Sequence, residues 1–389
     1  MLINMKLKYL SFIFVAVFTQ FNALAQSDFK IKYGPYLQNV QSDEATVVWV
    51  TSDDALGWVE VAPDDKTNFY AEERPKYFET INGRKAVGTV HKVRIKGLKE
   101  GVRYRYRIYS REVLDNDNWD VKYGKIAASS PSGLYSFKTL DKTKTEFEFA
   151  VINDIHANDE MLASLMKNVD ISKLDFVIFN GDMMTHLDSE QLMFEGFLNK
   201  SVELFASNLP FFFTRGNHET RGSFSIRFMD YFPTSTGVPY YCFRHGPAFF
   251  IMLDSGEDKP DSDIEYGGLS AFDDYRWEQA EWLKKIIQSE EFKKAPVKIV
   301  SIHVPAFASA WHGTLHVEEV FIPILNQANI DLMFCGHEHE HSYLPKGKKN
   351  NFPILTNSND EILDISVKGE KISIKISNTE GKVTKTIDL

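Results

Sequence analysis

Histidines gather in one short stretch of this chain, FCGHEHEHSY (334–343), where three of them alternate with two glutamates. The whole chain has only 11 histidines among its 389 residues. A solvated cluster of surface charge is the simpler interpretation of such a stretch. However, the stretch directly follows an apolar run, and imidazole is a common metal ligand, so a metal site is the second interpretation.

Four other apolar runs also end in residues that can bind a metal ion. In chain order, the five runs are EFAVIND (148–154), DFVIFNGD (175–182), PFFFTRGN (210–217), KIVSIH (298–303) and DLMFCGH (331–337). The candidate ligands at or just after their ends are Asp154, His156, Asp182, Asn217, His303, His337 and His339. A single histidine or Gly-Asp pair at the end of a strand is usually structural. Five such endings in one region predict that these side chains share a site.

The donor set indicates which ions and which reaction this site would serve. It contains no thiolate, which argues against a structural cysteine–zinc site. Carboxylate, imidazole and amide oxygen suit Zn²⁺, Mn²⁺ or iron in catalytic sites. The ligands are too many for one tetrahedral ion but suit two ions about 3.5–4 Å apart that share a carboxylate and a bridging hydroxide. Two divalent ions, two carboxylates and one hydroxide leave a charge of about +1, which favours a phosphate ester.

The elements that would position these side chains form an α/β domain, which we expect over residues 146–389. Near-continuous apolar runs are typical of strands buried on both faces, and helical spacing appears between them. In open α/β sheets ligands bind outside the carboxyl ends of the strands, so the candidate ligands should converge on one rim. His337 and His339 should point to the same side, because residues two apart on a strand do so.

Helices and hairpins are expected between and after these strands. The expected helices are 160–169, 189–205 and 273–291, with 317–328 a weaker candidate because it contains Pro323. Residues 309–316 are expected to form a loop. Alternating isoleucines near the C-terminus predict hairpins.

Residues 26–140 follow a different pattern, in which short segments alternate apolar and polar side chains. Examples are VHKVRIKGL (90–98) and YRYRI (104–108), and turns such as LKEG (98–101) separate them. Short strands of this kind predict an antiparallel β-sandwich, and we find no chemistry-bearing cluster in it. A polar linker, 141–145, joins this domain to the next.

The first 25 residues have the pattern of a secretory signal peptide. Lys6 and Lys8 precede a short apolar run, and Ala23-Leu24-Ala25 supplies the small residues required for cleavage. The apolar run is well short of the roughly 20 residues that span a bilayer. We expect cleavage after Ala25, no transmembrane segment in the remaining chain, and export to a periplasm or the exterior, with a bacterial envelope preferred.

Charge and cysteine content argue against several classes of protein. Loss of the signal peptide would change the formal net charge from −10 to −12. A net acidic chain without blocks of lysine and arginine is unlike a nucleic-acid coat or a binder of anionic membranes. Cys242 and Cys335 are too few for a disulfide framework. They are expected to be buried thiols, with a single bridge left open as the alternative.

Five blocks of the second domain resemble the complete signature of calcineurin-like metallophosphoesterases. They are DIH (154–156), GD (181–182), GNHE (216–219), His303 and GHEH (336–339). In the first domain, GPYLQNVQSDEATVVWV (34–50) and GLKEGVRYRYRI (97–108) resemble the fibronectin-type-III-like domain of purple acid phosphatases. The resemblance implies a four-layer β-sandwich flanked by helices, preceded by an all-β immunoglobulin/fibronectin-like sandwich.

The resemblance also implies that two metal ions share the candidate ligands, with Asp182 as the bridge. The ligands of one ion would be Asp154, His156, Asp182 and His339. Those of the other would be Asp182, Asn217, His303 and His337. His218 would donate a proton to the leaving group or stabilise charge in the transition state. The ions would be iron, zinc or manganese.

Two positions depart from the pattern of purple acid phosphatases. Those enzymes carry a tyrosine three residues after the bridging aspartate, where this chain has Thr185, and they lack a histidine where His156 stands. The tyrosinate–iron charge transfer behind the purple colour should therefore be absent, and a ferric ion loses its distinctive anchor. The second domain thus resembles the general metallophosphoesterase type.

Three further residues are candidate substrate contacts. Arg215 either contacts the substrate phosphate or forms a structural salt bridge. His341 either lines the substrate pocket or supports the metal ligands from behind. His312 lies with His316 in the expected loop 309–316, which could cover the site.

These observations predict an exported two-metal phosphohydrolase that cleaves phosphate mono- or diesters through attack by a metal-bound hydroxide. The alternative is a cell-envelope binding or adhesion protein with a non-catalytic metallophosphoesterase domain. The intact His218 favours the enzyme, because a structural metal site does not require a free proton donor. The expected partner is a small phosphate ester, and no nucleic-acid-binding surface is evident.

Overall fold

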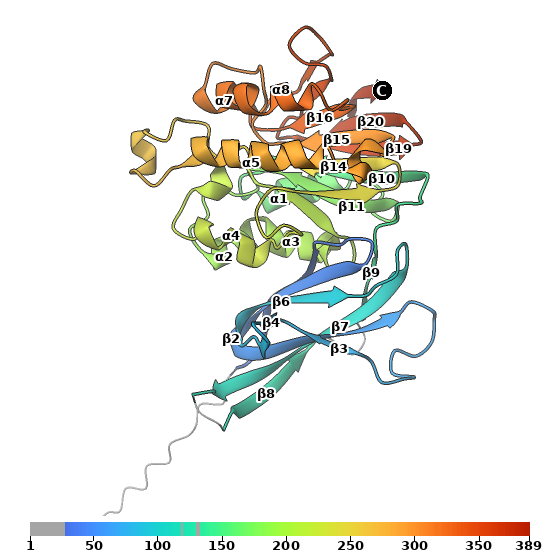
Figure 1. Cartoon of the computed structure of the whole chain (residues 1–389). Helices are drawn as coiled ribbons and strands as arrows, with labels where there is room; N and C mark the ends of the chain where they lie inside the picture. Colours follow the sequence, from blue (N-terminus) through green and yellow to red (C-terminus); the bar gives the residue numbers. More distant parts are fainter. Residues whose placement is uncertain (1–27, 118–119, 130–132) are drawn as a thin grey trace, which may run out of the picture.

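The computed structural model describes residues 28–117, 120–129 and 133–389, so the expected signal peptide, residues 1–25, lies outside it. Figure 1 shows a β-rich N-terminal part below a larger part in which helices flank two sheets. The expected domain boundaries, 26–140, 141–145 and 146–389, stay predictions. Over the described ranges, no helix has both the length and the apolar character needed to cross a membrane.

Strand β2 (Glu44–Pro63) organises the N-terminal part, because it is long enough to belong to two layers. Its first half pairs with β1 (Ile31–Gln38) and β6 (Gly88–Lys96), and its second half with β3 (Lys76–Phe78) and β7 (Arg103–Asp115). The remaining strands are β4 (Thr80–Ile81), β5 (Arg84–Lys85), β8 (Lys122–Ala128) and β9 (Tyr135–Lys138). Side chains from both halves of β2 share one buried core, so this part is an all-β sandwich, as expected.

Two six-stranded sheets form the centre of the larger part. The first has the order β12 (Phe211–Thr214), β11 (Leu174–Asn180), β10 (Glu146–Ile152), β19 (Glu361–Lys368), β20 (Lys371–Asn378) and β21 (Val383–Asp388). The second has the order β13 (Tyr241–His245), β14 (Ala248–Met252), β15 (Val297–Ser301), β16 (Leu332–Cys335), β18 (Ile354–Thr356) and β17 (Ser342–Leu344). The five apolar runs form β10, β11, β12, β15 and β16, which pair in parallel within their sheets, and β14 and β18, which were not expected, extend the parallel pairing of the second sheet.

The two sheets pack face to face mainly through phenylalanine side chains. Phe212 stacks on Phe243 with ring centroids 3.8 Å apart, and Phe176 contacts Phe250 edge to face at 5.4 Å. Full burial of one such side chain contributes about 1.5–3 kcal/mol. Two further apolar clusters join the outer faces of the sheets to helices. The result is the expected four-layer arrangement of helices, sheet, sheet and helices.

The helices lie on both outer faces of the pair of sheets. Those beside the first sheet are α1 (Asp159–Met166), α2 (Glu190–Met193), α3 (Asn199–Ser201), η4 (Ser225–Arg227) and α4 (Phe228–Tyr231), with the π-helical turns η1 (Phe194–Leu198) and η2 (Val202–Ala206). Those beside the second are α5 (Phe272–Ile286), α6 (Glu290–Lys293), α7 (His312–Val320) and α8 (Ile322–Leu325). The 3₁₀ turns η3 (His218–Thr220) and η5 (Ile264–Tyr266) lie in connecting loops.

Three expectations about helices are wrong in detail. The segment 189–205 is not a regular α-helix, because π-helical turns alternate with α2 and α3. The segment 273–291 is two helices, since Ser289 accepts a hydrogen bond from Phe292 N and starts α6. Helix α7 begins at His312, so residues 312–316 are not loop; its first turn is fixed where Gly313 N donates to Asp258 O at 2.8 Å.

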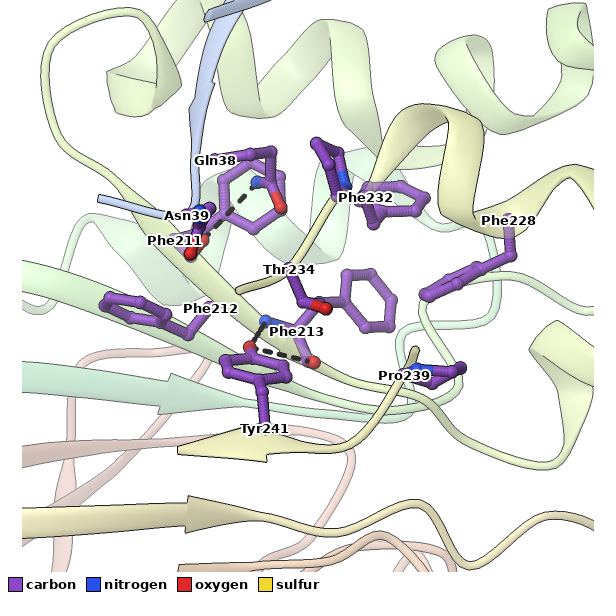
Figure 2. A pocket seen from close by; sticks show the side chains of 11 residues that line it. Gln38, Asn39, Phe211, Phe212, Phe213, Phe228, Phe232, Thr234, Pro239 and Tyr241 are labelled. Atoms are coloured by element: carbon purple, nitrogen blue, oxygen red, sulfur yellow. Dashed lines mark hydrogen bonds between the residues drawn. The ribbon is translucent and has the colours of Figure 1, made fainter. Parts of the chain in front are cut away.

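The N-terminal sandwich packs on the first sheet through a shared core. The buried ring of Tyr36 lies among Phe194, Phe211 and Phe232, and its hydroxyl donates to Tyr231 O at 2.9 Å. Figure 2 shows a small cavity at this junction, where Tyr241 reaches the backbone of β12. The cavity has a volume of about 10 Å³, enough for about one water molecule. It is therefore too small to bind a substrate.

Candidate metal centre

The candidate ligands lie in the loops that directly follow β10, β11 and β12 of the first sheet and β15 and β16 of the second. Their donor atoms form groups in which every pair lies within 4.8 Å. These groups are Asp154, His156 and His339; Asp182, His303 and His337; and His156, Asp182 and His218. Asn217, the remaining candidate, contacts His337. The structure thus brings together side chains from distant parts of the sequence.

Five of these residues have a left-handed backbone conformation. The φ angle is 55° at Asp154, 46° at His156, 54° at Asp182, 74° at His337 and 57° at His339. Side chains other than glycine adopt such angles at a cost of roughly 1–2 kcal/mol each, and the surroundings must hold them there. Strand β16 ends at Cys335, so the expected strand alternation does not orient the last two histidines. Positive φ at both positions does so instead.

Glycines next to the ligands allow the loops to approach one another closely. A Cβ atom on Gly216 would lie 2.2 Å from Asp182 Oδ1, and one on Gly336 would lie 2.6 Å from Asp154 Oδ2. A Cβ atom on Gly181 would lie 2.3 Å from His303 Nδ1. These separations are far below van der Waals contact, so larger residues at the three positions would push the ligands apart.

The Asp154 carboxylate has one saturated oxygen and one without a partner. Oδ2 accepts hydrogen bonds from Asn153 Nδ2 at 2.7 Å and His337 N at 2.9 Å. Oδ1 is buried without a hydrogen-bond partner, although His339 Nε2 lies 3.3 Å away and His303 Nε2 3.8 Å away. A buried carboxylate oxygen without a partner is costly, and a cation among these groups would satisfy it.

Asp182 and His303 form the innermost pair of the cluster. His303 Nδ1 donates to Asn180 O at 2.7 Å, which directs Nε2 towards Asp182 Oδ2 at 3.0 Å. Burial alone would lower the pKa of His303, but the charges of Asp182 and Asp154 outweigh it and raise the pKa to about 10. Burial acts to raise the pKa of Asp182, yet His303 and His218 hold it well below its usual range. Without a cation, a protonated imidazole supplies the positive charge of this site.

The side-chain amide of Asn217 points one end at three other candidate ligands. Its inward end lies 3.1 Å from His337 Nδ1, 3.3 Å from His303 Nε2 and 3.2 Å from Asp182 Oδ2. Turned end for end, the amide would donate to these atoms and accept from Arg221 Nη2 at 2.9 Å. With its oxygen inward, the amide would be a ligand for a cation held by the same atoms. Together with the unpartnered Asp154 Oδ1, this set of hard oxygens and imidazoles fits divalent metal ions.

We expect the metal-free protein to lose stability as the pH rises from about 6.5 to about 10. The raised pKa of His303 contributes stability that is fully present below 6.5 and is lost as the pH passes through about 10. Burial and the charge of Asp182 raise the pKa of Glu219 from 4.5 to about 7. This carboxyl therefore also destabilises the folded protein as the pH rises, but between about 4.5 and about 7. In a metal-loaded protein, a neutral His303 that binds the ion would no longer contribute to this loss.

Thermal unfolding of the chelated and the metal-loaded protein across this pH range tests the expectation. The melting temperature of the chelated form should fall more steeply with pH than that of the loaded form. Parallel profiles for the two forms would contradict it.

His218 lies beside the cluster with one ring nitrogen free of backbone contacts. Its Nδ1 donates to Thr185 O at 2.7 Å, which fixes the ring. Its Nε2 faces Asp182 Oδ2 at 3.9 Å and Arg221 Nη1 at 3.2 Å. Arg221 is held by Glu257 and Asp258, with Nη2 at 2.9 and 3.2 Å from their carboxylates. Sequence reasoning missed Arg221, and its position three residues after His218 was the only signal.

Glu219 is a second residue whose role was missed. It is buried, and its Oε2 accepts from Asp182 N at 2.8 Å and Gly216 N at 3.0 Å, while Oε1 accepts from Met184 N at 3.0 Å. One carboxylate therefore ties the loop after β11 to the loop after β12. The signal was the glutamate that ends the GNHE block.

The three candidate substrate contacts lie apart from the donor groups. Arg215 pairs with Asp254, with Nη2 2.6 Å and Nε 2.8 Å from the same oxygen. Its guanidinium therefore forms a structural salt bridge, which was one of the two expectations for this residue. His341 lies 3.5 Å from Glu361 and borders a hollow of about 370 Å³. His312 contacts Asp273 at 2.7 Å, in a cluster separate from the donor groups.

Cys242 and Cys335 are free thiols, the first half-buried and the second buried.

Comparison with known proteins identifies two matching segments. Residues 147–341 match the model of the calcineurin-like phosphoesterases, and residues 34–139 match the N-terminal domain of purple acid phosphatases. Purple acid phosphatase 21 of Arabidopsis thaliana is 25% identical over 65% of this chain and 52% of its own. Probable purple acid phosphatase 20 of the same plant is 26% identical over 62% and 57%.

A solved 5'-nucleotidase from Candida albicans aligns with 62% of this chain and 52% of its own, with 13% identity and a TM-score of 0.34. The chain spans about half the length of the curated relatives it matches. Residues 34–139 fall within the β-sandwich, and residues 147–341 cover every loop that carries a candidate ligand. The chain belongs to the calcineurin-like phosphoesterase family and carries a purple acid phosphatase N-terminal domain in front of its phosphoesterase domain.

Proposed function

We propose that this protein is an exported hydrolase of phosphate mono- or diesters that uses two metal ions. One observation carries the proposal: carboxylate and imidazole donors from five strand-end loops form overlapping groups, and one of those groups contains the unpartnered Oδ1 of Asp154. Membership of the family supports it, as do relatives named as purple acid phosphatases. Iron, zinc and manganese all suit this donor set.

The proposed ligands divide between the two ions, with Asp182 shared. One ion would take Asp154, His156, Asp182 and His339. The other would take Asp182, Asn217, His303 and His337. When bound, such a pair of ions activates water and withdraws charge from the phosphoryl oxygens.

His218 and Arg221 act on the substrate in this proposal. With Nδ1–H donated to Thr185 O, His218 in its imidazolium form carries a second proton on Nε2, which it would hand to the leaving oxygen. Arg221 Nη1 lies 3.2 Å from that nitrogen and would bind a phosphate oxygen as the leaving group departs. Glu257 and Asp258 hold the guanidinium in place for this contact.

Replacing Arg221 with alanine is expected to raise KM and to lower kcat/KM by about 10- to 100-fold, because a positioned charge near the phosphate is lost. Arg227→Ala is the matched control, since that arginine is 47% exposed and pairs with Asp230 away from the cluster. Steady-state kinetics on a nitrophenyl phosphate measures both. Equal effects of the two substitutions would refute the role of Arg221.

Two hollows open beside the proposed ligands and would receive the substituents of the ester. One, of about 340 Å³, is bordered by Thr185 and His186, and the other, of about 370 Å³, by Glu338 and His341. The assay therefore needs both monoesters and diesters. We expect metal-loaded protein to hydrolyse nitrophenyl phosphate, bis-nitrophenyl phosphate or both, and chelation to abolish the activity.

A binding or adhesion protein is the competing function. It predicts no turnover of nucleotides, sugar phosphates, phospholipids or nitrophenyl esters with added Mn²⁺, Zn²⁺ or Fe²⁺. Metal analysis of the same samples separates an inert protein from an unloaded one. Lack of turnover by fully loaded protein would overturn the proposed hydrolase.

The proposed export depends on the N-terminal sequence, where two lysines, an apolar run and Ala23-Leu24-Ala25 precede Gln26. We expect protein recovered from the periplasm or the medium of a bacterial host to begin at Gln26. N-terminal sequencing measures this directly. Cytoplasmic protein that retains residues 1–25 would contradict export.

A further inference from the structure

A second group of metal-capable side chains lies outside the candidate metal centre. His312 and His316 are one turn apart on α7, and Asp273 lies in the first turn of α5. Their donor atoms all lie within 4.8 Å of one another. His312 Nε2 is 2.7 Å and His316 Nδ1 is 3.3 Å from the same oxygen, Asp273 Oδ1. Two helices thus direct two imidazoles at one carboxylate.

We propose that Asp273, His312 and His316 bind a third divalent cation. A tetrahedral ion with bonds of about 2.0–2.2 Å holds its donor atoms roughly 3.4 Å apart. His316 Nδ1 and Asp273 Oδ1 already lie 3.3 Å apart, whereas His312 Nε2 would move outward from its 2.7 Å contact with the same oxygen. Two imidazoles and one carboxylate suit Zn²⁺, Co²⁺ or Ni²⁺ and are a poor match for Mg²⁺ or Ca²⁺. Three protein ligands leave the fourth position to water.

The rings and their surroundings permit an ion to enter. The two imidazoles are stacked, with centroids 5.5 Å apart and planes inclined by 19°. The side chains of His312 and Asp273 are 33% and 35% exposed, so the cluster is reached from solvent. Binding would require side-chain movements that bring both nitrogens onto one ion.

Arg276 sets the strength of this site. Its Nη1 lies 2.9 Å from Asp273 Oδ1 and 3.1 Å from His316 Nδ1, so an ion competes with it for the imidazole. Its other nitrogens donate to Ser255 O and Glu257 O, so the guanidinium stays nearby when Nη1 gives up His316 Nδ1 to an ion. Asp273 can accept from Arg276 and bind an ion at the same time. The nearby positive charge makes this site weaker than the centre that contains Asp154 and Asp182.

An ion bound here would fasten α7 to α5. Gly313, one residue after His312, donates from its backbone to Asp258 O at 2.8 Å, and Asp258 in turn contacts Arg221. The third ion would therefore stabilise the start of α7, and with it the segment that supports Arg221.

The test counts bound ions on untagged, full-length mature protein dialysed against Zn²⁺. We expect three ions per chain in the native protein and one fewer in His312→Ala and in Asp273→Asn. Asp274→Asn is the matched control, because it removes the same charge from the next residue, which is exposed on α5. It should bind as many ions as the native protein. Melting temperature gives a second readout: the additional rise at high Zn²⁺ should vanish in the two cluster variants only.

Two results would overturn the proposal. One is a native protein that saturates at two ions, which needs no variant to interpret. The other is an equal ion count in His312→Ala, Asp273→Asn and Asp274→Asn. Hydrolysis is measured separately, so an inactive protein that still loses one ion with His312→Ala supports the third site while refuting the proposed hydrolase.

Discussion

Replacing Asp182 with asparagine is expected to lower kcat/KM for phosphate esters by at least a factor on the order of 10³ and to reduce the metal content. The carboxylate lies 3.0 Å from His303 and accepts a hydrogen bond from His218 N at 2.9 Å. Asp182 therefore belongs both to the donor group with His303 and to the donor group with His218. The amide keeps the shape of the side chain but lacks its charge. Without that charge neither ion is held at the shared position. Kinetics together with elemental analysis measures both effects.

Controls separate this effect from damage to the fold. Asp54→Asn removes a carboxylate from an exposed position on β2 and should leave activity and metal content unchanged. His337→Ala, on the other side of the cluster, should reproduce the loss seen with Asp182→Asn. Circular dichroism and the melting temperature report whether each variant folds. Full activity in both ligand variants would sink the assignment of the site.

Replacing His218 with glutamine is expected to lower kcat by about 10²- to 10⁴-fold for an alkyl phosphate while both ions stay bound. The imidazole lies outside the ligand set, and its Nε2 has no backbone partner. The deficit should shrink for a nitrophenyl ester, because a stable leaving group does not require a proton. This dependence on the leaving group distinguishes a proton donor from a residue that only shapes the site.

His186→Gln is the comparison for this variant. Its ring lies 6.1 Å from that of His218, so it shares the neighbourhood but not the position. We expect a smaller loss that is independent of the leaving group. The same fractional loss for alkyl and nitrophenyl esters in His218→Gln would refute the assigned proton transfer.

The arrangement of the strands was predictable because buried parallel strands have a plain signature. The runs that end near Asp154 and Asp182 are almost continuously apolar, as is typical of strands covered on both faces. Their ends meet at one edge of the sheet, so the proximity of these side chains follows from the pattern. Their roles as ligands stay a prediction, which the variants above address.

Other parts of the site could not be read from the sequence, because they depend on loop geometry. The positive φ angles at His337 and His339 follow from the packing of distant loops and not from local propensity. The bond of Arg215 to Asp254 and the contact of Arg221 with His218 join residues that no spacing rule connects. Likewise, α7 begins at His312 because its first turn is held by Asp258, in a loop more than 50 residues earlier.

The insertion of Tyr36 into the core beside the first sheet affects how the molecule unfolds. Its ring contacts Phe194, Phe211 and Phe232, so a cut in the chain near residue 140 would leave an aromatic surface open to water on each fragment. Each fragment would therefore be less stable alone than within the intact chain. The whole molecule should therefore melt cooperatively in a single calorimetric transition.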